Sequence, residues 1–516
     1  MKSIDLRLPR LEVLMRRDGQ GPYVPPNGDA RLLKLFLGAT SWTLTLPALL
    51  AEQLHQHLFP GDGDEHGAVV LAGIADSLAG PRLLARDVVL AIDGKDYVPG
   101  QHGYRMLTPQ FVSRVARRCR DERLAYLAVH NHGGTNHVQF SDDDYASHKR
   151  GYPALLDIVD GLPVGALVFA KAAVAGSLWI SPSHQLPLSE ARVLGARIER
   201  LTPEPVAPPA GRARTYDRQA RVFGDRGQDI LRRTKVGIIG AGGIGSLIVE
   251  FLSRLGVGHF VIVDPDIITE TNVPRITGST HRHAASWFTS GARPQWLRRI
   301  GERLARTKVR HMRRLIRRAQ PRAKVEVIRD DVLRNAVAHR FCDCDYLVLA
   351  ADSMQARLVF NALVHAFLIP GVQVGVKVPV DVLSGEVGEI FCADRPVLPS
   401  SGCLWCNGLI TAAGLQRESE RPDERRAQRY VDEEEVIAPS VITLNAIAAA
   451  LAANDFMFAM TGLTKPDTSL GYTMAWPRER AMSRVAPRRD PACPHCGSQH
   501  GSILARGDAA DLHTRC

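Results

Sequence analysis

Residues 235–266, KVGIIGAGGIGSLIVEFLSRLGVGHFVIVDPD, decide the fold of the chain around them. A short apolar run, 236–239, turns through glycines into a helical pattern, and a second apolar run, 260–263, follows. Strand, glycine turn, helix and strand in this order predict a βαβ unit. We therefore expect a Rossmann-like α/β domain here.

The turn holds the series Gly240-Ala-Gly242-Gly243-Ile-Gly245, and the second strand ends at Asp264. Glycines permit the tight turn and a close approach of the backbone to phosphate, and the helix N-terminus favours negative charge. Asp264 is placed to hydrogen-bond a ribose. The stretch predicts a nucleotide site, and taken alone it leaves an NAD-dependent oxidoreductase open.

The bulk composition is that of a globular protein with two or more domains. The chain has 516 residues, of which 45% are hydrophobic and 23% charged. No window of about 18 apolar residues predicts a membrane span, and the N-terminus lacks a signal-peptide pattern, so we expect a cytoplasmic protein. Nine cysteines, partly in CxxC pairs, suit metal binding or free thiols better than a disulfide framework.

The net charge of +11 is concentrated in residues 293–322, where arginines recur at helical spacing. A basic helix of this kind is most simply a solvated face, and the alternative is a surface for an acidic partner or for phosphates. No nucleic-acid motif accompanies it, so we do not expect DNA or RNA binding.

The first 200 residues mix strand and helix patterns and predict an α+β domain. Helices are expected at 46–58 and 109–120, and strands at 65–73, 86–92, 124–129, 166–172 and 176–180, the last two closing the unit. Glu65 stands at the mouth of one strand, and another strand delivers His130 and His132. Ser141 and Asp144 follow at the start of a helical pattern.

These side chains suit a catalytic zinc site, although an isolated H-x-H pair is more often structural. His130, His132 and Asp144 would supply three ligands and leave one position open for water. Glu65 would take the proton of that water and pass it to a leaving amine, and Ser141 would steady the developing oxyanion.

The five-residue pattern resembles the JAMM (JAB/MPN) metalloprotease motif over about residues 40–185. It departs from that motif at Asn131, where the family usually has Ser or Thr, and by a spacer before Ser141 that is one residue longer. Asn131 is not a ligand in the family pattern, and the extra residue falls in a loop. The resemblance implies an intact metal site with Glu65 as its acid–base.

Residues 201–214 hold four prolines and predict a semi-rigid linker. We therefore expect one domain at 1–200 and a second at 215–516. The second continues past the glycine series into further polar positions, which are Arg218, Asp266, Asn272, Arg275, Lys308 and Asp352.

This longer series resembles the ThiF/MoeB family, the adenylation fold shared with ubiquitin-activating enzymes, over about residues 215–500. The resemblance implies ATP and magnesium as cofactors and a homodimer as the assembly. It places Asp264 at the ribose and Asn272, Arg275 and Lys308 at the phosphates, and it includes Asp266 among the nucleotide-binding residues. Asp352 would bind magnesium, and Arg218 would reach an active site, often across the dimer interface.

Two features depart from that family. The segment between Arg275 and Lys308 is longer than usual, and the stretch 409–439 lacks the cysteine with which many relatives form a thioester or persulfide. Among the other cysteines, Cys119, Cys342 and Cys344 lie in or beside apolar runs and are expected to be buried, while Cys392 ends a strand and Cys516 is terminal. We expect an enzyme that stops at the acyl-adenylate or passes the acyl group directly to a partner's thiol.

Two CxxC pairs lie far apart, at Cys403 with Cys406 and at Cys493 with Cys496. Four thiolates in two knuckles predict a closed, structural zinc site, which the ThiF/MoeB family commonly carries. Between them, residues 439–457 form a small-residue pattern that is apolar nearly all round, which predicts a fully buried helix.

The two resemblances together imply linked chemistry. The JAMM-like domain would process or deconjugate a ubiquitin-like or sulfur-carrier protein, and the second domain would adenylate the C-terminal glycine of that protein. A conjugating enzyme or a sulfurtransferase would be a further partner. The alternatives are sulfur-carrier activation for cofactor synthesis and a protease with a regulatory nucleotide-binding module.

Overall fold

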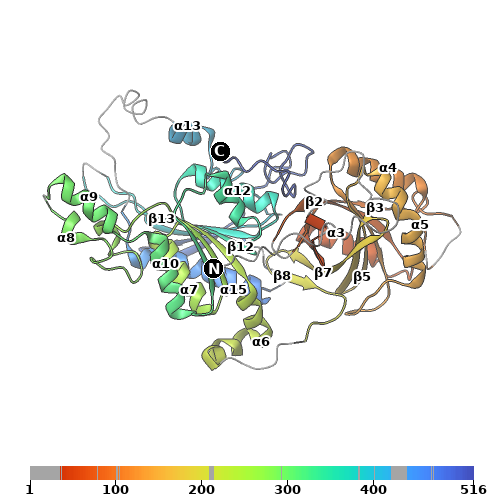
Figure 1. Cartoon of the computed structure of the whole chain (residues 1–516), viewed down its shortest axis with the longest axis horizontal. Helices are drawn as coiled ribbons and strands as arrows, with labels where there is room; N and C mark the ends of the chain where they lie inside the picture. Colours follow the sequence, from red (N-terminus) through yellow and green to blue (C-terminus); the bar gives the residue numbers. More distant parts are fainter. Residues whose placement is uncertain are drawn as a thin grey trace, which may run out of the picture. The chain divides into compact units, whose positions relative to one another are not determined.

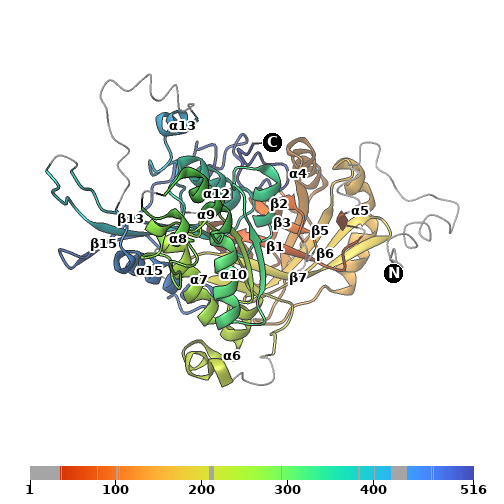
Figure 2. The same ribbon diagram turned by 60° about the vertical axis from the view of Figure 1, so that its left-hand side comes forward.

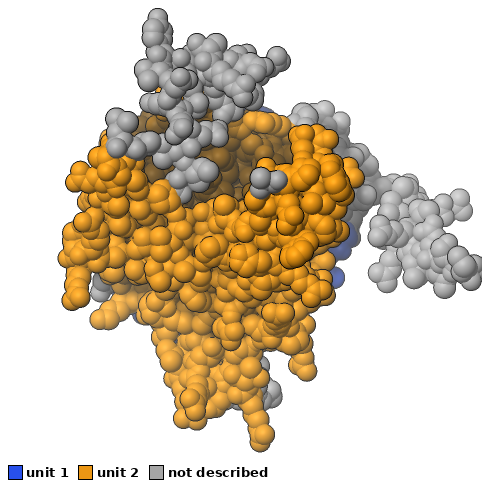
Figure 3. Space-filling view, turned by 90° about the vertical axis from the view of Figure 1, so that its left-hand side faces the viewer, with its two compact units in different colours: residues 1–44, 52–191, 201–205 blue, residues 45–51, 192–200, 206–516 orange. Residues whose placement is uncertain are grey.

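The structure is a computed structural model that describes residues 35–515, apart from residues 37, 78–79, 100–102, 104, 208–213, 292, 382–383, 400, 420–438, 466–467 and 469. Residues 208–213 of the predicted linker, residues 420–438 of the stretch 409–439 and Cys516 lie outside the described residues. Contacts divide the chain into two compact units (Figure 3). The first comprises residues 1–44, 52–191 and 201–205, and the second comprises 45–51, 192–200 and 206–516.

An eight-stranded sheet of order β1-β3-β2-β4-β5-β6-β7-β8, in which β1 also pairs with β7, organises the N-terminal region. Its elements are β1 (Trp42–Pro47), α3 (Ala48–Leu58), β2 (Gly67–Ala75), β3 (Arg82–Leu90), α4 (Pro109–Glu122), β4 (Ala125–Asn131), α5 (Asp142–Ile158), β5 (Val164–Ala170), β6 (Ala173–Ser181), β7 (His184–Leu194) and β8 (Ile198–Leu201). All nine residues of β2 are buried, because β2 lies between β3 and β4. The β4–β5 pair is parallel, and the β2–β3, β2–β4, β5–β6 and β6–β7 pairs are antiparallel.

The expectation that β6 closes this region was wrong, because β7 and β8 continue the sheet. Strand β7 buries Leu186, Leu188, Ala191 and Leu194. Proline at 187 and charge at 190 hide this strand in the sequence, since both residue types are depleted in strands. The expected helix at 46–58 also begins later, at Ala48, because residues 42–47 form β1.

A second eight-stranded sheet, of order β11-β10-β9-β12-β13-β14-β15-β16, organises the C-terminal region. Its elements are α6 (Asp217–Arg233), β9 (Lys235–Ile239), α7 (Gly243–Leu255), β10 (His259–Val263), α8 (Ser286–Thr289), α9 (Gln295–Leu304), α10 (Lys308–Ala319), β11 (Lys324–Ile328), α11 (Asn335–Ala338), β12 (Tyr346–Leu349), α12 (Met354–Ala366), β13 (Gly371–Lys377), β14 (Phe391–Val397), α13 (Ala412–Ser419), α15 (Ile442–Thr461), β15 (Tyr472–Trp476) and β16 (Ala481–Val485). Strands β9 to β13 are parallel, and β14 to β16 are antiparallel. The predicted Rossmann-like α/β fold is confirmed.

Helices α7, α10 and α15 cover one face of this sheet, and α12 covers the other (Figures 1 and 2). Crossovers between parallel strands are right-handed. Because β10 lies on one side of the β9–β12 pair in the strand order and β13 lies on the other, the helices of these two crossovers lie on opposite faces of the sheet. The carboxyl ends of β9, β10 and β12 therefore meet at one edge.

The arginine-rich segment is two helices, so the expectation of a single basic helix was wrong. Helix α9 ends at Ala305 in extended backbone, and Thr307 caps α10 by accepting a hydrogen bond from the Arg310 N–H at 3.4 Å. Helix α10 is firmly packed, with Val309, Met312, Leu315 and Ile316 buried.

Helix α15 is not buried all round. Its buried residues are Asn445, Ala448, Ala449, Ala452, Ala453, Phe456, Ala459 and Met460, while Ile447 and Phe458 are exposed. Among the described helices it is long and apolar enough to cross a membrane by length and composition alone. Its contacts with α7, β13 and β14 identify it as a core helix of the second unit.

Candidate nucleotide and metal sites

The strand order of the second sheet creates a crevice where ligands bind in doubly wound folds. Strands β10 and β11 extend to one side of β9, and β12 and β13 extend to the other. Binding sites of such sheets lie at the carboxyl ends of the strands where the order reverses. The glycine series follows β9, Asp264 follows β10 and Asp352 follows β12, so this edge carries three parts of the predicted site.

The glycines of the series have different physical tasks. Gly240 has a φ of 97°, and a Cβ on Gly245 would stand 2.1 Å from the Gly240 carbonyl oxygen. Gly243 packs against Asn445 of α15, whose Nδ2 would lie 2.5 Å from an added Cβ. Gly242, at the N-cap of α7, has nothing within 4 Å of its Cβ position. The open position at Gly242 is therefore where a phosphate would approach the backbone.

Asp264 and Lys308 lie together at this edge. The Asp264 carboxylate accepts hydrogen bonds from the N–H of Ala241 at 2.7 Å and of Asp266 at 2.9 Å. The Lys308 ammonium lies 2.7 Å from Oδ2 of Asp266 and 3.7 Å from Oδ1 of Asp264. Burial raises the pKa of Asp264, and Lys308 opposes that shift. The carboxylate thus fixes the glycine turn, while its ribose contact stays a prediction.

Asn272 is the last residue of a short 3-10 turn (Glu270–Asn272), and in the turn that follows the Arg275 N–H donates to the Asn272 carbonyl at 3.0 Å. The Asn272 Oδ1 accepts a hydrogen bond from the Thr269 N–H at 3.3 Å, so its side chain closes this turn. The Arg275 carbonyl oxygen lies 3.5 Å from the Cβ position of Gly243. Among the described residues, no carboxylate pairs with the Arg275 guanidinium, which leaves it available for phosphate. Asp352 is exposed, and its role as a magnesium ligand stays a prediction.

Arg218 lies away from this edge. The adjacent Gln219 donates a hydrogen bond to the Leu255 carbonyl at 2.9 Å, at the C-terminal end of α7. The glycine turn is at the other end of this 13-residue helix, about 20 Å away at 1.5 Å per residue. The structure therefore does not bring Arg218 to the nucleotide site of its own chain.

The sequence interpretation missed Asn445. Its side chain is 2% exposed, and its Nδ2 donates to Ser440 Oγ at 3.1 Å while packing on the first turn of α7. The available signal was an asparagine near the start of a largely apolar helix, because a buried amide needs partners.

In the first unit, the predicted metal ligands converge. The His130 Nε2 lies 3.2 Å from the His132 Nε2 and 3.3 Å from Asp144 Oδ1. The His132 Nε2 lies 3.4 Å from Asp144 Oδ2. A tetrahedral zinc ion with ligands at 2.0–2.1 Å requires ligand–ligand distances of about 3.3–3.4 Å. The three residues fit such an ion.

Glu65 lies beside the ligand His132, and Ser141 hydrogen-bonds to the ligand Asp144. The Glu65 Oε1 lies 3.7 Å from the His132 Nε2, and burial raises the pKa of this carboxyl while both histidines oppose the shift. Ser141 is the N-cap of α5, and its hydroxyl donates to Asp144 Oδ2 at 2.8 Å. Ser141 thus orients a ligand, and its role at an oxyanion stays a prediction.

Asn131, the middle residue of the H-x-H series, also has a structural task. Its Oδ1 accepts a hydrogen bond from the backbone N–H of His66 at 2.6 Å. This bond ties the start of β2 to the end of β4. It holds Glu65, one residue before His66, next to the two histidines.

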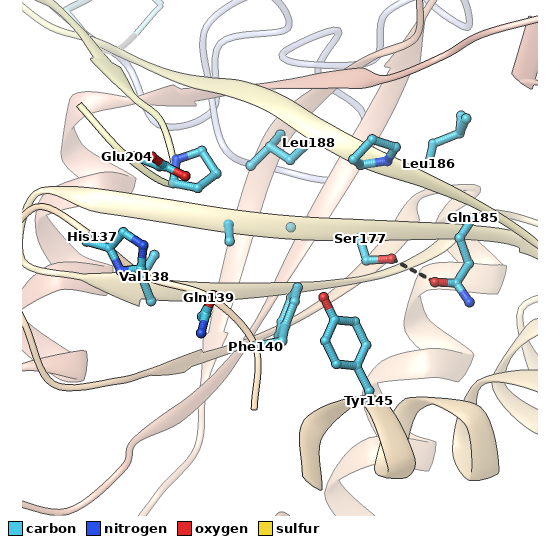
Figure 4. A pocket seen from close by; sticks show the side chains of 14 residues that line it. His137, Val138, Gln139, Phe140, Tyr145, Ser177, Gln185, Leu186, Leu188 and Glu204 are labelled. Atoms are coloured by element: carbon cyan, nitrogen blue, oxygen red, sulfur yellow. Dashed lines mark hydrogen bonds between the residues drawn. The ribbon is translucent and has the colours of Figure 1, made fainter. Parts of the chain in front are cut away.

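A pocket of about 430 Å³ adjoins the ligands (Figure 4). The rings of Phe140 and Tyr145, 5.6 Å apart, form one wall, and Ser177 and Gln185 of β6 and β7 form another. Gly176, which has no side chain, is also among the lining residues. The Phe140 ring also lies 6.2 Å from that of His130, so the pocket shares this wall with the metal ligands, although they do not line it.

The two CxxC pairs also converge. Cys403 Sγ lies 3.6 Å from Cys493 Sγ, and Cys406 Sγ lies 3.6 Å from Cys496 Sγ. All four sulfurs lie within 4.8 Å of one another. Tetrahedral zinc with sulfur at 2.3 Å requires sulfur–sulfur distances of about 3.8 Å, which these residues meet.

The remaining described cysteines do not offer a nucleophile. Cys119, Cys342 and Cys344 are buried, as predicted, and so is Cys392. Burial raises the pKa of Cys119 to about 12 and that of Cys392 to about 11, so these thiols stay protonated at neutral pH.

Comparisons with known proteins agree on the second region. The ThiF family model matches residues 216–495. The sulfur carrier protein ThiS adenylyltransferase of Bacillus subtilis is 24% identical over 284 residues, which cover 55% of this chain and 70% of that protein. The adenylyltransferase and sulfurtransferase UBA4 of Yarrowia lipolytica is 42% identical over 64 residues, 12% of this chain and 16% of that protein. A crystal structure of E. coli MccB, 19% identical, covers 57% of this chain and 75% of that chain with a TM-score of 0.41.

Proposed function

The chain belongs to the ThiF family of adenylyltransferases, and we propose that it activates the C-terminal glycine of a small ubiquitin-like or sulfur-carrier protein with ATP. The observation that carries this proposal is the meeting of the glycine turn, Lys308 and Asp352 at one edge of the sheet. Similarity to the ThiS adenylyltransferase supports the substrate class.

The proposed reaction is an attack by the carrier's carboxylate oxygen on the α-phosphorus of ATP. A new P–O bond forms, the bond to the β-phosphate oxygen breaks, and pyrophosphate leaves with the electron pair. Lys308 and Arg275 would neutralise charge on the phosphates as it develops. A magnesium ion at Asp352 would share that charge with them.

Without a cysteine in the stretch 409–439, the acyl group would stay as the adenylate or pass to a thiol of the partner. The partner would be a sulfurtransferase in cofactor synthesis or a conjugating enzyme in protein tagging. Because Arg218 lies at the far end of α7, we propose that it acts across a homodimer if it acts in catalysis.

ATP–pyrophosphate exchange tests this function. The chain is incubated with each ubiquitin-like or sulfur-carrier protein of its source, with its mature C-terminus. We expect exchange with one of them, and we expect its loss when the terminal glycine is removed. Binding of NAD in place of magnesium–ATP would overturn the proposal.

We also propose that the first unit is a zinc metalloprotease acting on the same carrier. The ligand distances of 3.2, 3.3 and 3.4 Å among His130, His132 and Asp144 support it. A zinc ion held there would lower the pKa of a water molecule. Glu65 would accept the proton of the attacking water and give it to the leaving amine as the carbon–nitrogen bond breaks.

The pocket beside these ligands would hold the segment next to the cleaved bond. Carriers extended beyond the terminal glycine are the test substrate, and mass spectrometry follows their trimming. E65Q should abolish trimming and keep the zinc, whereas S177W, which fills the pocket, should raise KM and keep the zinc. Unchanged trimming by E65Q would overturn the protease.

A further inference from the structure

Helix α13 rests on the first turn of α12, the helix that begins directly after Asp352. The Glu418 carboxylate of α13 accepts two hydrogen bonds there, from the backbone N–H of Met354 at 2.7 Å and from that of Gln355 at 3.0 Å. The Gln355 Nε2 also donates to the Ser419 Oγ at 3.3 Å. A carboxylate from a distant segment of the chain thus closes the start of α12.

Glu418 supplies acceptors that α12 itself lacks. Ser353 is the N-cap of α12, and its Oγ accepts a hydrogen bond from the Ala356 N–H at 3.1 Å. The first N–H groups of a helix have no partner within the helix and carry partial positive charge, so they bind anions. If Glu418 left, the N–H groups of Met354 and Gln355 would be open to another anion.

This position borders the candidate nucleotide site. The chain between β12 and α12 packs on the glycine turn, because a Cβ on Gly240 would lie 2.9 Å from the Ala351 backbone nitrogen. Met354 follows Ala351 by three residues, so the nitrogen atoms of these two residues lie within about 11 Å of each other. Asp352, the predicted magnesium ligand, stands between them. Glu418 therefore places a negative charge next to the site where adenylation would occur.

Helix α13 is mostly exposed. Of its eight residues, Gly414 is buried and five are exposed. The missing side chain at Gly414 lets α13 approach α12, since an added Cβ would stand 1.9 Å from the Met354 Sδ. Segments that bury little apolar surface open at a low cost in free energy. The two hydrogen bonds of Glu418 are therefore a large part of what keeps α13 docked.

We propose that α13 is an autoinhibitory element, in which Glu418 occupies the position of the carrier's terminal carboxylate. Adenylation requires that carboxylate to reach the α-phosphate, beside the magnesium ion proposed at Asp352. The carrier would displace Glu418 from the N–H groups of Met354 and Gln355, and α13 would leave α12. This inference rests on the proposed function, because it needs a substrate whose reacting group is a carboxylate.

ATP–pyrophosphate exchange at increasing concentrations of mature carrier tests the inference. The candidates are the ubiquitin-like and sulfur-carrier proteins of the source, each tried with wild type and with E418Q. E418Q keeps the size of the side chain and removes its charge and one acceptor. We expect the carrier concentration for half-maximal exchange to fall about tenfold, because losing a charged hydrogen bond shifts the docked population by that order. The affinity for magnesium–ATP, measured by calorimetry, should change less than twofold.

G414F should release α13 by a second route, because its ring needs the space of the Met354 side chain and the charge stays the same. It should lower the half-maximal carrier concentration as E418Q does. In both variants the Met354 and Gln355 amides should exchange with deuterium faster than in wild type. The controls are R417Q, at an exposed position of α13, and E479Q, at an exposed carboxylate elsewhere, and neither should change these values. Circular dichroism checks that every variant folds.

A half-maximal carrier concentration that is unchanged or higher in E418Q and G414F would overturn the inference. Glu418 would then be a helix cap, and the adenylation would stand. A tenfold gain in magnesium–ATP affinity without any effect on the carrier would also overturn it, by giving the position to a phosphate of ATP. If neither wild type nor E418Q supports exchange with any carrier, the proposed adenylation falls and the inference falls with it.

Discussion

Lys308 and Asp266 form an ion pair of 2.7 Å across 42 residues of sequence, although an inserted segment with helices α8 and α9 separates them. The Lys308 N–H also donates to the Asp266 carbonyl at 3.0 Å, so backbone and side chain hold the start of α10 at the carboxyl end of β10. Despite the inserted segment, Lys308 therefore lies next to Asp264, the residue predicted to bind the ribose.

The first prediction concerns this lysine. K308M should lower ATP–pyrophosphate exchange by about 100-fold, because a charged hydrogen bond to a developing phosphate charge contributes about 3 kcal/mol. The control is R317M, on the outer face of α10. Exchange within threefold of wild type in K308M would contradict the assignment of Lys308 to the phosphates.

The second prediction separates two glycines of the turn. G245A places a Cβ 2.1 Å from the Gly240 carbonyl oxygen and should cost about 1–3 kcal/mol of unfolding free energy, measured by urea denaturation. The added Cβ of G242A meets nothing within 4 Å, so the unfolding free energy should not change. The affinity for ATP, measured by calorimetry, should fall. A stable G245A protein with normal ATP affinity would show that the turn differs from the one described.

Some of this site follows from sequence and some does not. The glycine series and the H-x-H pair are local, so their spacing predicts a nucleotide-binding turn and two neighbouring candidate metal ligands. Tertiary packing decides the rest. Asn445 reaches Gly243 from α15, and His283 meets His311 only because Arg306 ties the inserted segment to α10. Periodicity also could not show that α15 leaves Phe458 exposed, since neighbouring elements decide that.

The third prediction concerns the two candidate zinc sites. Mass spectrometry of the native protein should find two zinc ions per chain, and D144N should retain one. An open three-residue site loses metal to a chelator faster than a closed four-thiolate site. Brief chelation should therefore stop trimming and keep the melting temperature, whereas C403S should lower that temperature. Two zinc ions in D144N would exclude Asp144 as a ligand.

The fourth prediction follows from Asp394 in β14, which is 1% exposed with both carboxylate oxygens unpartnered among the described residues. Burial first, and then the charge of Asp455, raise its pKa well above the ordinary value. The folded state therefore holds a proton that the unfolded state loses above about pH 4, so stability falls as pH rises, by up to about 1.4 kcal/mol per pH unit.

D394N mimics the protonated acid at every pH. At pH 4 its unfolding free energy should match that of wild type, and at pH 8 it should exceed it, as measured by urea denaturation at both values. The control E479Q changes an exposed carboxylate and should show no such divergence. If the stability of D394N instead follows that of wild type in parallel between pH 4 and pH 8, Asp394 is ionised in the folded protein. A wild-type stability that rises over this range would then show that other groups dominate the pH dependence.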